Sequence, residues 1–485
     1  MLSRWRRSGG SSVAEAEARA ERAEAEVVEL RLALEQRDAV IEELRARISK
    51  LEGQLSANSS NSSKPPSSDP VGRKPKRGSG RKGKKLKRGG QPGHDGTTRR
   101  PPTRAEADEE RDCVPQHCEH CGEALSGSDP KPVGRVIIDI PKPSVRIIWY
   151  WLHRLHCAKC GRTTQGQPPN AMGQSHFGVS LHALSVLLCG RFRQTKRLVS
   201  EMLYTLYGLE ISPATVCAME QRASEALAGP VDELRADLRA REVVHADETS
   251  WRRLRDKAWL WVAATETTVS YWIDRRRSSK VVERMLGADF GGTIVVDRWS
   301  AYARLRRAFC WAHLLRDFEA MIDRYSSPWH GQRLAHCTRQ ILSLWRRWAD
   351  GDISRADMTE QMKPLQATFE ARLDWATRNA PGEDARKKAR EIARHKECLW
   401  RFVEDPRVPP TNNLAERVIR PGVILRKLTF GNDSLRGSVF TERILTTVET
   451  LRLQQRDVFD FLGQALTAHN HKQPAPSLLP SRSDT

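Results

Sequence analysis

A 3-4 spacing of apolar residues marks the beginning of the chain. Positions 27, 30, 34, 37, 41, 44, 48, 51 and 55 are all Val, Leu or Ile except Arg37. Glutamates and arginines fill the positions between them, as in the solvated flanks of a heptad repeat. The pattern predicts a coiled coil over residues 13–56 and, through it, a homodimer or higher oligomer. A single amphipathic helix that packs on its own protein is the alternative.

A polar segment follows the heptads. SANSSNSSKPPSSDP ends the helical pattern, and residues 64–104 carry 14 lysines and arginines against Asp69 and Asp95. Such a composition cannot bury a core, so residues 57–110 are predicted to be a flexible basic linker. We expect it to contact DNA phosphates without reading sequence, although a solubilising linker would look similar. The candidate DNA-binding residues here are Lys82, Lys84, Lys85, Lys87 and Arg88.

Two cysteine pairs have the spacing of metal ligands. The four candidate zinc ligands are Cys118, Cys121, Cys157 and Cys160, in two C-x-x-C motifs separated by β-rich sequence. Four thiolates complete a tetrahedral Zn²⁺ site with no open position, so a structural zinc ribbon is predicted over residues 111–168. Cys113, His117 and His120 are spare ligands nearby, and unligated thiols are the alternative.

Helical patterns occupy residues 175–235. LVSEMLYTLYGLE ends near Gly208, and Ser212-Pro213 supplies an N-cap and a first-turn proline for ATVCAMEQRASEAL. A DNA-reading helix-turn-helix and an ordinary helical hairpin both fit this pattern.

Residues 240–450 alternate between strand and helix patterns. EVVHADETSW, AWLWVAATE and VSYWIDRRR predict three antiparallel strands, SSKVVERMLG a crossover helix, and GGTIVVDRW a parallel strand beside the first. RAFCWAHLL is a candidate fifth strand. A helical insertion is expected at about 315–405, and a C-terminal helix and tail at 451–485. The predicted fold is an α/β ribonuclease-H-like core with this insertion, preceded by the coiled coil and zinc ribbon.

Three acidic residues stand out within this region. Asp247 and Asp297 end β-branched runs, and Glu416 opens a helix in TNNLAERVIR. Brought together, they would hold two Mg²⁺ or Mn²⁺ ions for phosphodiester chemistry, because hard cations prefer carboxylate oxygens. Each also has a structural alternative. Asp247 could be a surface residue at a strand end, Asp297 could cap a helix in SAYARLRR, and Glu416 could close a capping box with Asn413 as N-cap.

The charge of the whole chain favours a polyanionic partner. The formal net charge is +21 and the pI is about 9.9, so DNA is the expected partner. The first residues lack the apolar core of a signal peptide, and no run approaches the roughly 20 apolar residues of a membrane span. We therefore expect a cytoplasmic protein that is associated with the nucleoid when bound to DNA.

From the heptads onward the chain resembles the insertion-sequence-66 family of transposases, which belong to the DDE class. The resemblance rests on SSNSSKPPSSD, the paired C-x-x-C segment, ADETSW, VVDRWSAY, FCWAHLLRDF, TNNLAERVIRPGVILRKLTFGN and TTVETLRLQQRDVFDFL. It implies Mg²⁺-dependent strand cleavage and strand transfer at terminal inverted repeats, with Asp247, Asp297 and Glu416 as the acids. The chain departs from the family after C-x-x-H, at residues 314–317, while Cys310 and His313 are expected to support the fold.

Basic residues follow the third acid. Arg417, Arg420, Arg426 and Lys427 are candidates for phosphate contacts, and a solvated basic face is the alternative. Two other functions remain open: a catalytically inactive zinc-ribbon DNA-binding regulator, and a sequence-independent ribonuclease-H-like nuclease. The sequence does not tell whether accessory proteins take part.

Overall fold

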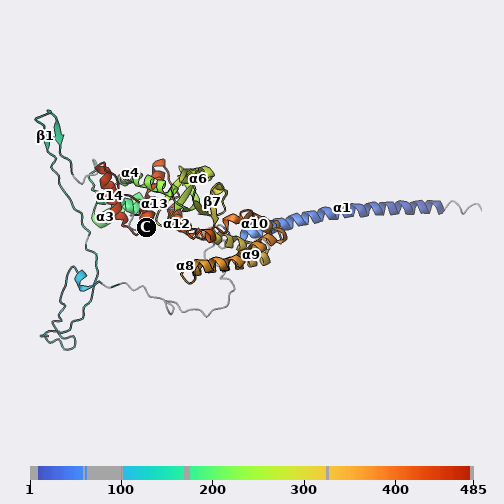
Figure 1. Cartoon of the computed structure of the whole chain (residues 1–485), viewed down its shortest axis with the longest axis horizontal. Helices are drawn as coiled ribbons and strands as arrows, with labels where there is room; N and C mark the ends of the chain where they lie inside the picture. The colour runs from blue at the N-terminus through green and yellow to red at the C-terminus, as the bar shows by residue number, and fades with distance from the viewer. Residues whose placement is uncertain are drawn as a thin grey trace, which may run out of the picture. The chain divides into compact units, whose positions relative to one another are not determined.

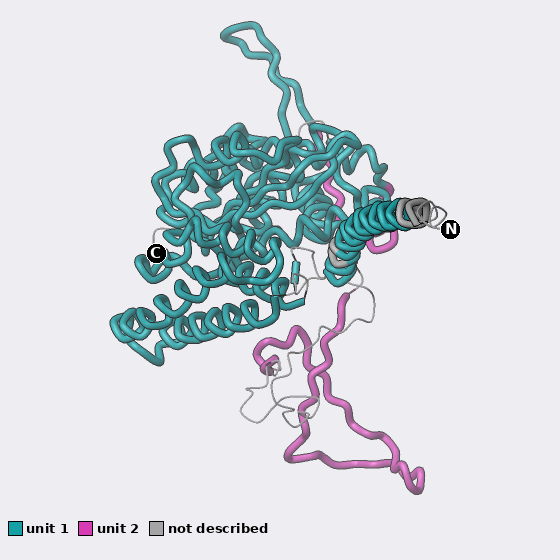
Figure 2. Tube along the Cα trace, turned by 90° about the vertical axis from the view of Figure 1, so that its right-hand side faces the viewer, with its two compact units in different colours: residues 1–73, 152–200, 211–485 teal, residues 74–151, 201–210 magenta. Residues whose placement is uncertain are grey.

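The computed structural model describes residues 9–57, 61–62, 100, 102–141, 143–168, 175–323 and 327–480. The chain divides into two compact units, shown in different colours in Figure 2. The first contains residues 1–73, 152–200 and 211–485, and the second contains residues 74–151 and 201–210. Most of the predicted basic linker, including its five candidate DNA-binding residues (four lysines and Arg88), lies outside the described residues.

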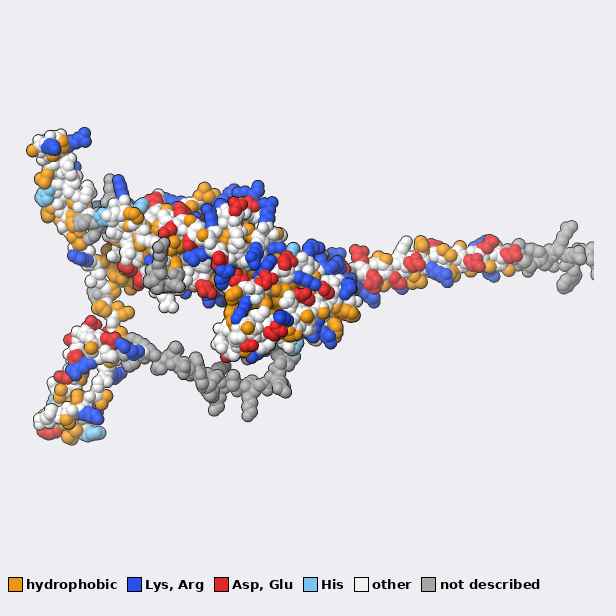
Figure 3. Space-filling view, in the orientation of Figure 1, with side chains coloured by type: hydrophobic (Ala, Val, Ile, Leu, Met, Phe, Trp, Pro, Cys, Tyr) orange, Lys and Arg blue, Asp and Glu red, His pale blue; other side chains and the backbone are white. Residues whose placement is uncertain are grey.

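The first element is a single long helix, α1 (Gly9–Leu55), which is continuous in Figure 1. It confirms the predicted helix. Apolar side chains lie between charged ones along its surface (Figure 3), and of the heptad positions Leu34, Leu44 and Leu51 are each about half exposed. Their pairing in a coiled coil stays a prediction.

Residues 102–151 contain little regular structure. The described part has one turn of 3-10 helix, η2 (Arg104–Glu106), and one isolated bridge between His117 and Ala124. The β-rich interpretation is wrong for the described residues 134–141 and 143–151, which form no strand. Consecutive apolar side chains such as Ile137 and Ile138 are exposed here, so the segment has no buried face on which a sheet could form. The short strands β1 (Arg154–His156) and β2 (Thr163–Gln165) follow and pair antiparallel.

Residues 175–240 are helical, as predicted. The helices are α2 (Val179–Gly190), α3 (Lys196–Tyr207), α4 (Pro213–Ala226) and α5 (Ala228–Arg239). The expected cap of α4 is confirmed, because the Thr215 N–H donates to Ser212 Oγ at 3.1 Å. α3 crosses the boundary between the two units, so the helix-turn-helix arrangement stays a prediction.

A five-stranded sheet lies at the centre of the first unit. Its strands are β3 (Val243–Arg253), β4 (Asp256–Ala264), β5 (Val269–Asp274), β6 (Thr293–Val296) and β7 (Arg306–Phe309), in the spatial order β5-β4-β3-β6-β7. β3, β4 and β5 pair antiparallel, α6 (Ser279–Leu286) follows, and β6 lies parallel to β3. β6 and β7 are parallel and joined through η3 (Ser300–Tyr302). The predicted strand order is confirmed.

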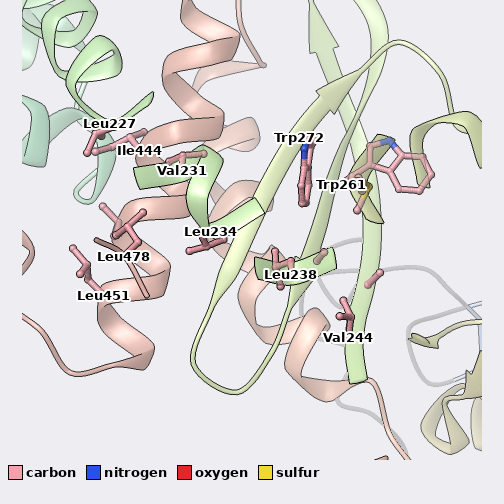
Figure 4. Packing of buried hydrophobic residues seen from close by; sticks show 14 of the residues in the cluster. Leu227, Val231, Leu234, Leu238, Val244, Trp261, Trp272, Ile444, Leu451 and Leu478 are labelled. Atoms are coloured by element: carbon pink, nitrogen blue, oxygen red, sulfur yellow. The ribbon is translucent and has the colours of Figure 1, made fainter. Parts of the chain in front are cut away.

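The two faces of the sheet bury alternate residues of each strand. On one face, Val244, Trp261 and Trp272 pack with helices α4, α5 and α6 and with α13 (Leu435–Leu453) and α14 (Val458–Asn470). Figure 4 shows part of this core, with α5 and α13 approaching the sheet. On the other face, residues including Leu260 and Val262 pack against α12 (Asn413–Thr429).

The expected helical insertion is present between β7 and α12. It consists of α7 (Trp311–Asp323), α8 (Pro328–Ala349), α9 (Arg355–Asn379), α10 (Glu383–Ala393), η4 (Lys396–Cys398) and α11 (Arg401–Glu404). RAFCWAHLL is a strand only as far as Phe309. Helix α7 begins at Trp311 because the N–H groups of His313 and Leu314 bond to the Cys310 carbonyl, and Trp311 is buried among the aromatic side chains of the insertion.

The C-terminal helix is also present. α13 continues to Leu453 and α14 covers Val458–Asn470, while the tail to residue 480 has neither helix nor strand. None of the helices described contains an apolar stretch long enough to cross a membrane.

Candidate active site

Asp247 lies on β3, and Asp297 directly follows the neighbouring strand β6. β3 and β6 pair in parallel from Val243–Thr293 to His245–Val295. Continued by two residues, this register sets Asp247 beside Asp297, and both side chains face the α12 side because strand residues alternate. Asp247 is not a surface residue at a strand end, since β3 continues to Arg253 and Asp247 pairs with Val262 of β4. The parallel pairing ends two residues before the acids, at His245 and Val295.

The electrostatics of the two aspartates reflect this proximity. Burial raises the pKa of Asp247 well above its ordinary value, and the charges of Glu248, Asp297 and Glu416 raise it further. Burial also raises the pKa of Asp297, although a hydrogen bond from the Trp299 N–H at 2.8 Å and the nearby arginines offset part of the effect. Asp247 accepts a 2.8 Å bond from the Glu248 N–H, and among the described residues neither aspartate has an ion pair. Two such carboxylates fit a divalent cation, which prefers hard oxygen ligands.

Glu416 comes from the first turns of α12 on the same face of the sheet. The alternative of a capping box is wrong: the N-cap is Asn412, not Asn413, and its side chain caps no backbone group of the helix. Asn412 instead donates to the Ala246 carbonyl at 2.8 Å and bonds to His245 Nδ1 at 3.0 Å. These bonds fix the beginning of α12 to β3 immediately before the first aspartate, and they leave the Glu416 carboxylate available for other partners.

Arg316 of α7 holds the Glu416 carboxylate, and His313 of the same helix lies beside it. Arg316 Nη2 donates to Glu416 Oε1 at 2.9 Å and to His313 Nε2 at 3.1 Å. His313 Nε2 is thus the acceptor, so Nδ1 carries the hydrogen and faces Glu416 Oε1 at 3.5 Å. Burial, with the charges of Arg316 and Arg298, lowers the pKa of His313 to about 3, so the imidazole is neutral. The helix that follows C-x-x-H, where the chain departs from the family pattern, therefore orients the third acid.

Cys310 lies beside the same group. Its ligand atom and those of His313 and Glu416 all lie within 4.8 Å of one another, which is the spacing of a metal site. However, burial raises the pKa of the Cys310 thiol to about 11, and its sulfur accepts a bond from the Asn412 N–H at 3.1 Å. The Arg316 guanidinium already contacts the other two donors. These contacts suit side chains that support the fold, as expected for Cys310 and His313.

A fourth acid in the region, Glu248, was missed by the sequence analysis. Its side chain is only 2% exposed and lies on the opposite face of β3 from Asp247. Tyr302 Oη donates to it at 2.5 Å and Arg277 at 2.7 Å. The Arg277 guanidinium also stacks on the Trp299 ring, 3.9 Å from its centroid. Glu248 thus fixes the loop that follows Asp297. The sequence did contain a sign of it. Glu248 lies on the opposite face of a buried strand from Asp247, and a carboxylate buried there requires a partner.

A partly buried ion-pair network joins the site to the insertion. Arg298, directly after Asp297, pairs with Asp317 of α7 and lies 3.5 Å from Glu391 of α10. Lys388 of α10 completes the network, 3.8 Å from Asp317. The Arg298 side chain is 12% exposed and Asp317 20%. The network therefore connects the end of β6 to two helices that the sequence could not place.

The basic residues of α12 differ in their surroundings. Arg417, Arg420 and Lys427 are exposed and form no ion pair among the described residues. Arg426 is half-buried, and its Nη1 donates to Thr249 Oγ1 at 3.0 Å and to Ser250 Oγ at 2.5 Å. Its guanidinium thus binds β3, which leaves the first three as the candidates for phosphate contact.

Each C-x-x-C motif forms a tight turn. Cys118 N–H bonds to the Glu123 carbonyl and Cys157 N–H to the Arg162 carbonyl, both at 2.8 Å. Gly122 and Gly161 end the two turns with positive φ angles of 77° and 68°. Hydrogen bonds from nearby backbone N–H groups lower the pKa of the Cys118 and Cys157 thiols, as suits thiolate ligands. The two turns belong to different units. Each turn separately has the form of half a zinc site, and a shared site stays a prediction.

Comparison with known proteins places most of the folded part of the chain in one family. The model of the Transposase IS66 family matches residues 175–439, which include the sheet, the insertion and all three acids. Residues 12–100 match a family of unknown function (DUF6444). The uncharacterized protein y4qI of Sinorhizobium fredii (strain NBRC 101917 / NGR234) is 26% identical over 317 residues, which cover 57% of each chain. The chain thus spans little more than half the length of this relative. Because the first match covers more than half of its 485 residues, the chain belongs to the IS66 family of transposases.

Proposed function

We propose that this protein is a DDE transposase, which cleaves DNA at the terminal inverted repeats of an insertion sequence and joins the freed ends to target DNA. The observation that carries the proposal is the register of β3 and β6, which aligns two partly buried aspartates that have no ion pair within the described part of the chain. The strand order β5-β4-β3-β6-β7, antiparallel and then parallel, supports a ribonuclease-H-like core. Family membership supports the transposition function.

Asp247, Asp297 and Glu416 are the residues that would hold Mg²⁺ or Mn²⁺ in this function. When bound, such a metal pair lowers the pKa of the attacking hydroxyl and stabilises charge on the leaving oxygen. The protein's own contribution is positional. Asn412 ties the start of α12 to β3, and Arg316, which also bonds to the neutral His313, holds the Glu416 carboxylate in place.

The remaining parts of the chain would bind and arrange DNA. Arg417, Arg420 and Lys427 are exposed cations on the helix that carries Glu416, so they can contact phosphates beside the acids. The two C-x-x-C turns would form a structural zinc ribbon, and the basic linker would add contacts that do not depend on sequence. Pairing of α1 through its apolar seam would bring two active sites together for the two ends of an element.

A cleavage assay with matched variants tests the proposal. The substrate is labelled DNA from the two segments that border the gene, with Mg²⁺ and an unlabelled target plasmid. Asp247→Asn and Asp297→Asn should lose cleavage while keeping their affinity for DNA, because only the metal ligands change. Asp289→Asn, an exposed acid outside the site, should cleave like the wild type. Full cleavage by either aspartate variant would refute the site, and cleavage without joining would indicate a nuclease.

A further inference from the structure

Three bulky residues with strained backbones gather at one end of α12 and β3. Leu254 and Arg255 form the two-residue turn between β3 and β4 with φ angles of 53° and 67°, and Phe430 ends α12 with φ of 60°. These are three of the six non-glycine residues with positive φ in the described part of the chain. Such turns favour Gly, Asn or Asp, since a Cβ makes this conformation unfavourable. All three side chains are exposed, so packing does not explain the choice of residues.

The strained residues belong to one rigid unit. Asn432 bonds through its backbone to the Arg252 carbonyl at 3.0 Å and to the Leu254 N–H at 2.8 Å. Its side-chain oxygen accepts from Trp251 Nε1 at 2.9 Å. A Cβ on Gly431 would lie 2.3 Å from the Arg252 carbonyl oxygen, so only glycine allows this close approach. The hairpin and the turn after α12 therefore present their side chains on a fixed frame.

The exposed surface of this unit combines apolar and cationic side chains. Phe430 is 75% exposed, Leu428 58% and Leu254 40%. Arg252, Arg255 and Lys427 are exposed beside them, and among the described residues none of these three has an ion pair. Unpaired cations around an aromatic ring suit a nucleic acid, whose bases have π faces and whose backbone is anionic. A protein partner would find single apolar side chains separated by charges instead of a continuous patch.

We propose that Phe430, supported by Leu254, inserts beside a base of the bound DNA and opens the stack at that step, while Arg252, Arg255 and Lys427 contact the flanking phosphates. We call this surface the wedge. The proposal rests on the function proposed above and adds the place where the protein deforms its DNA substrate. An apolar side chain that enters a base step unstacks it and bends the duplex, as in other DNA-binding proteins.

The fold also sets the distance from the wedge to the acids. α12 and the turn after it run alongside β3. Hydrogen bonds join Asn412 to Ala246, Arg426 to Ser250 and Asn432 to Arg252. From Glu416 to Phe430, 14 residues of helix span about 21 Å at 1.5 Å each. From Asp247 to Leu254, seven residues of strand span about 23 Å. At about 3.4 Å per base, the opened step lies about six nucleotides from the cleaved bond.

Permanganate footprinting of thymines tests the wedge. The full-length protein is bound to duplexes of the DNA that borders its gene, with Ca²⁺ in place of Mg²⁺ to prevent cleavage. Wild-type protein should expose a reactive base about six steps from the bond that is cut in Mg²⁺. Phe430→Ala and Phe430→Gly should lose this signal and about tenfold in affinity, while Phe430→Trp should retain both. Arg255→Ala should reduce the slope of the logarithm of the DNA-binding constant against the logarithm of the salt concentration by about one.

Controls separate the wedge from folding and from the catalytic proposal. Phe459→Ala removes another exposed phenylalanine, on α14, and should leave the footprint unchanged. If wild-type protein cleaves while Phe430→Ala gives the same footprint and affinity, the wedge is overturned. If Phe430→Ala changes only the oligomeric state, the surface binds a second copy and the wedge is likewise overturned. A Phe430-dependent footprint on DNA that wild-type protein does not cleave supports the wedge and refutes the catalytic function.

Discussion

Replacing Arg298 by methionine should destabilise the protein by about 3–5 kcal/mol, because the change leaves a buried carboxylate without its main partner. Arg298 is 12% exposed and Asp317 20%, so neither charge is well solvated. Lys388, 3.8 Å from Asp317, is too distant to replace the guanidinium fully. Methionine keeps much of the side-chain volume, so the loss reports charge rather than a cavity. Arg304→Met, at an exposed pair with Glu283, should cost less than about 1 kcal/mol.

A double-mutant cycle measures how much of this destabilisation comes from the interaction between Arg298 and Asp317. Asp317→Asn removes the other charge, and the double variant leaves neither charge unpaired. The sum of the single effects should therefore exceed the effect of the double variant by about 1–3 kcal/mol. Urea unfolding followed by tryptophan fluorescence suits this test, because Trp311 and Trp400 lie in the core of the insertion that Asp317 joins to the sheet. Effects of Arg298→Met and Asp317→Asn that add within about 0.5 kcal/mol would refute the coupling.

Three further predictions concern other parts of the fold. Gly431→Ala should cost about 2–3 kcal/mol in urea unfolding, since its φ is 114° and its Cβ would meet the Arg252 carbonyl; an unchanged midpoint would contradict the close approach. Burial, aided by the charge of Arg222, lowers the pKa of His182 below its ordinary 6.5, so the stability that His182 gives is lost as pH falls below about 6.5, where the unfolded state takes up the proton first. His182→Gln should flatten this part of the stability profile, and an identical profile would exclude His182. Leu34→Asp should halve the mass measured by sedimentation equilibrium, because it places a charge in the apolar seam of α1; Glu35→Asp is the control, and an unchanged mass would exclude pairing through this seam.

The strand order and the helical insertion could be predicted from the sequence because each rests on a local pattern. β-branched runs separated by hairpin-length gaps predicted β3, β4 and β5, and the parallel neighbour of β3 followed from the crossover helix. The face of Asp247 was also predictable, since strand residues alternate. The strand boundary after Phe309 was not, because Cys310 and the buried Trp311 continue an apolar run whose period does not distinguish strand from helix.

The partners of the site residues could not be predicted, because they come from distant parts of the chain. Glu416 contacts Arg316, which lies 100 residues away, and nothing in the helical pattern of α7 selects that arginine from its neighbours. The local cap pattern pointed to Asn413, whereas the N-cap is Asn412 and its side chain bonds to β3. Arg426 looked like a DNA contact by charge alone, and tertiary packing directs it to Ser250. Only the folded chain determines which cations remain free.

The three residue pairs between β3 and β6 have a consequence for how this sequence can change. The position of each aspartate is set by its short distance along the strand from those pairs, and not by the 49 residues that separate the two aspartates. Insertions in the hairpin turns or before α6 can therefore be tolerated without moving the acids. A single deletion between 243 and 247, or between 293 and 297, would turn one carboxylate to the opposite side of the sheet. Indels in these two short windows should inactivate the protein even where every acid is retained.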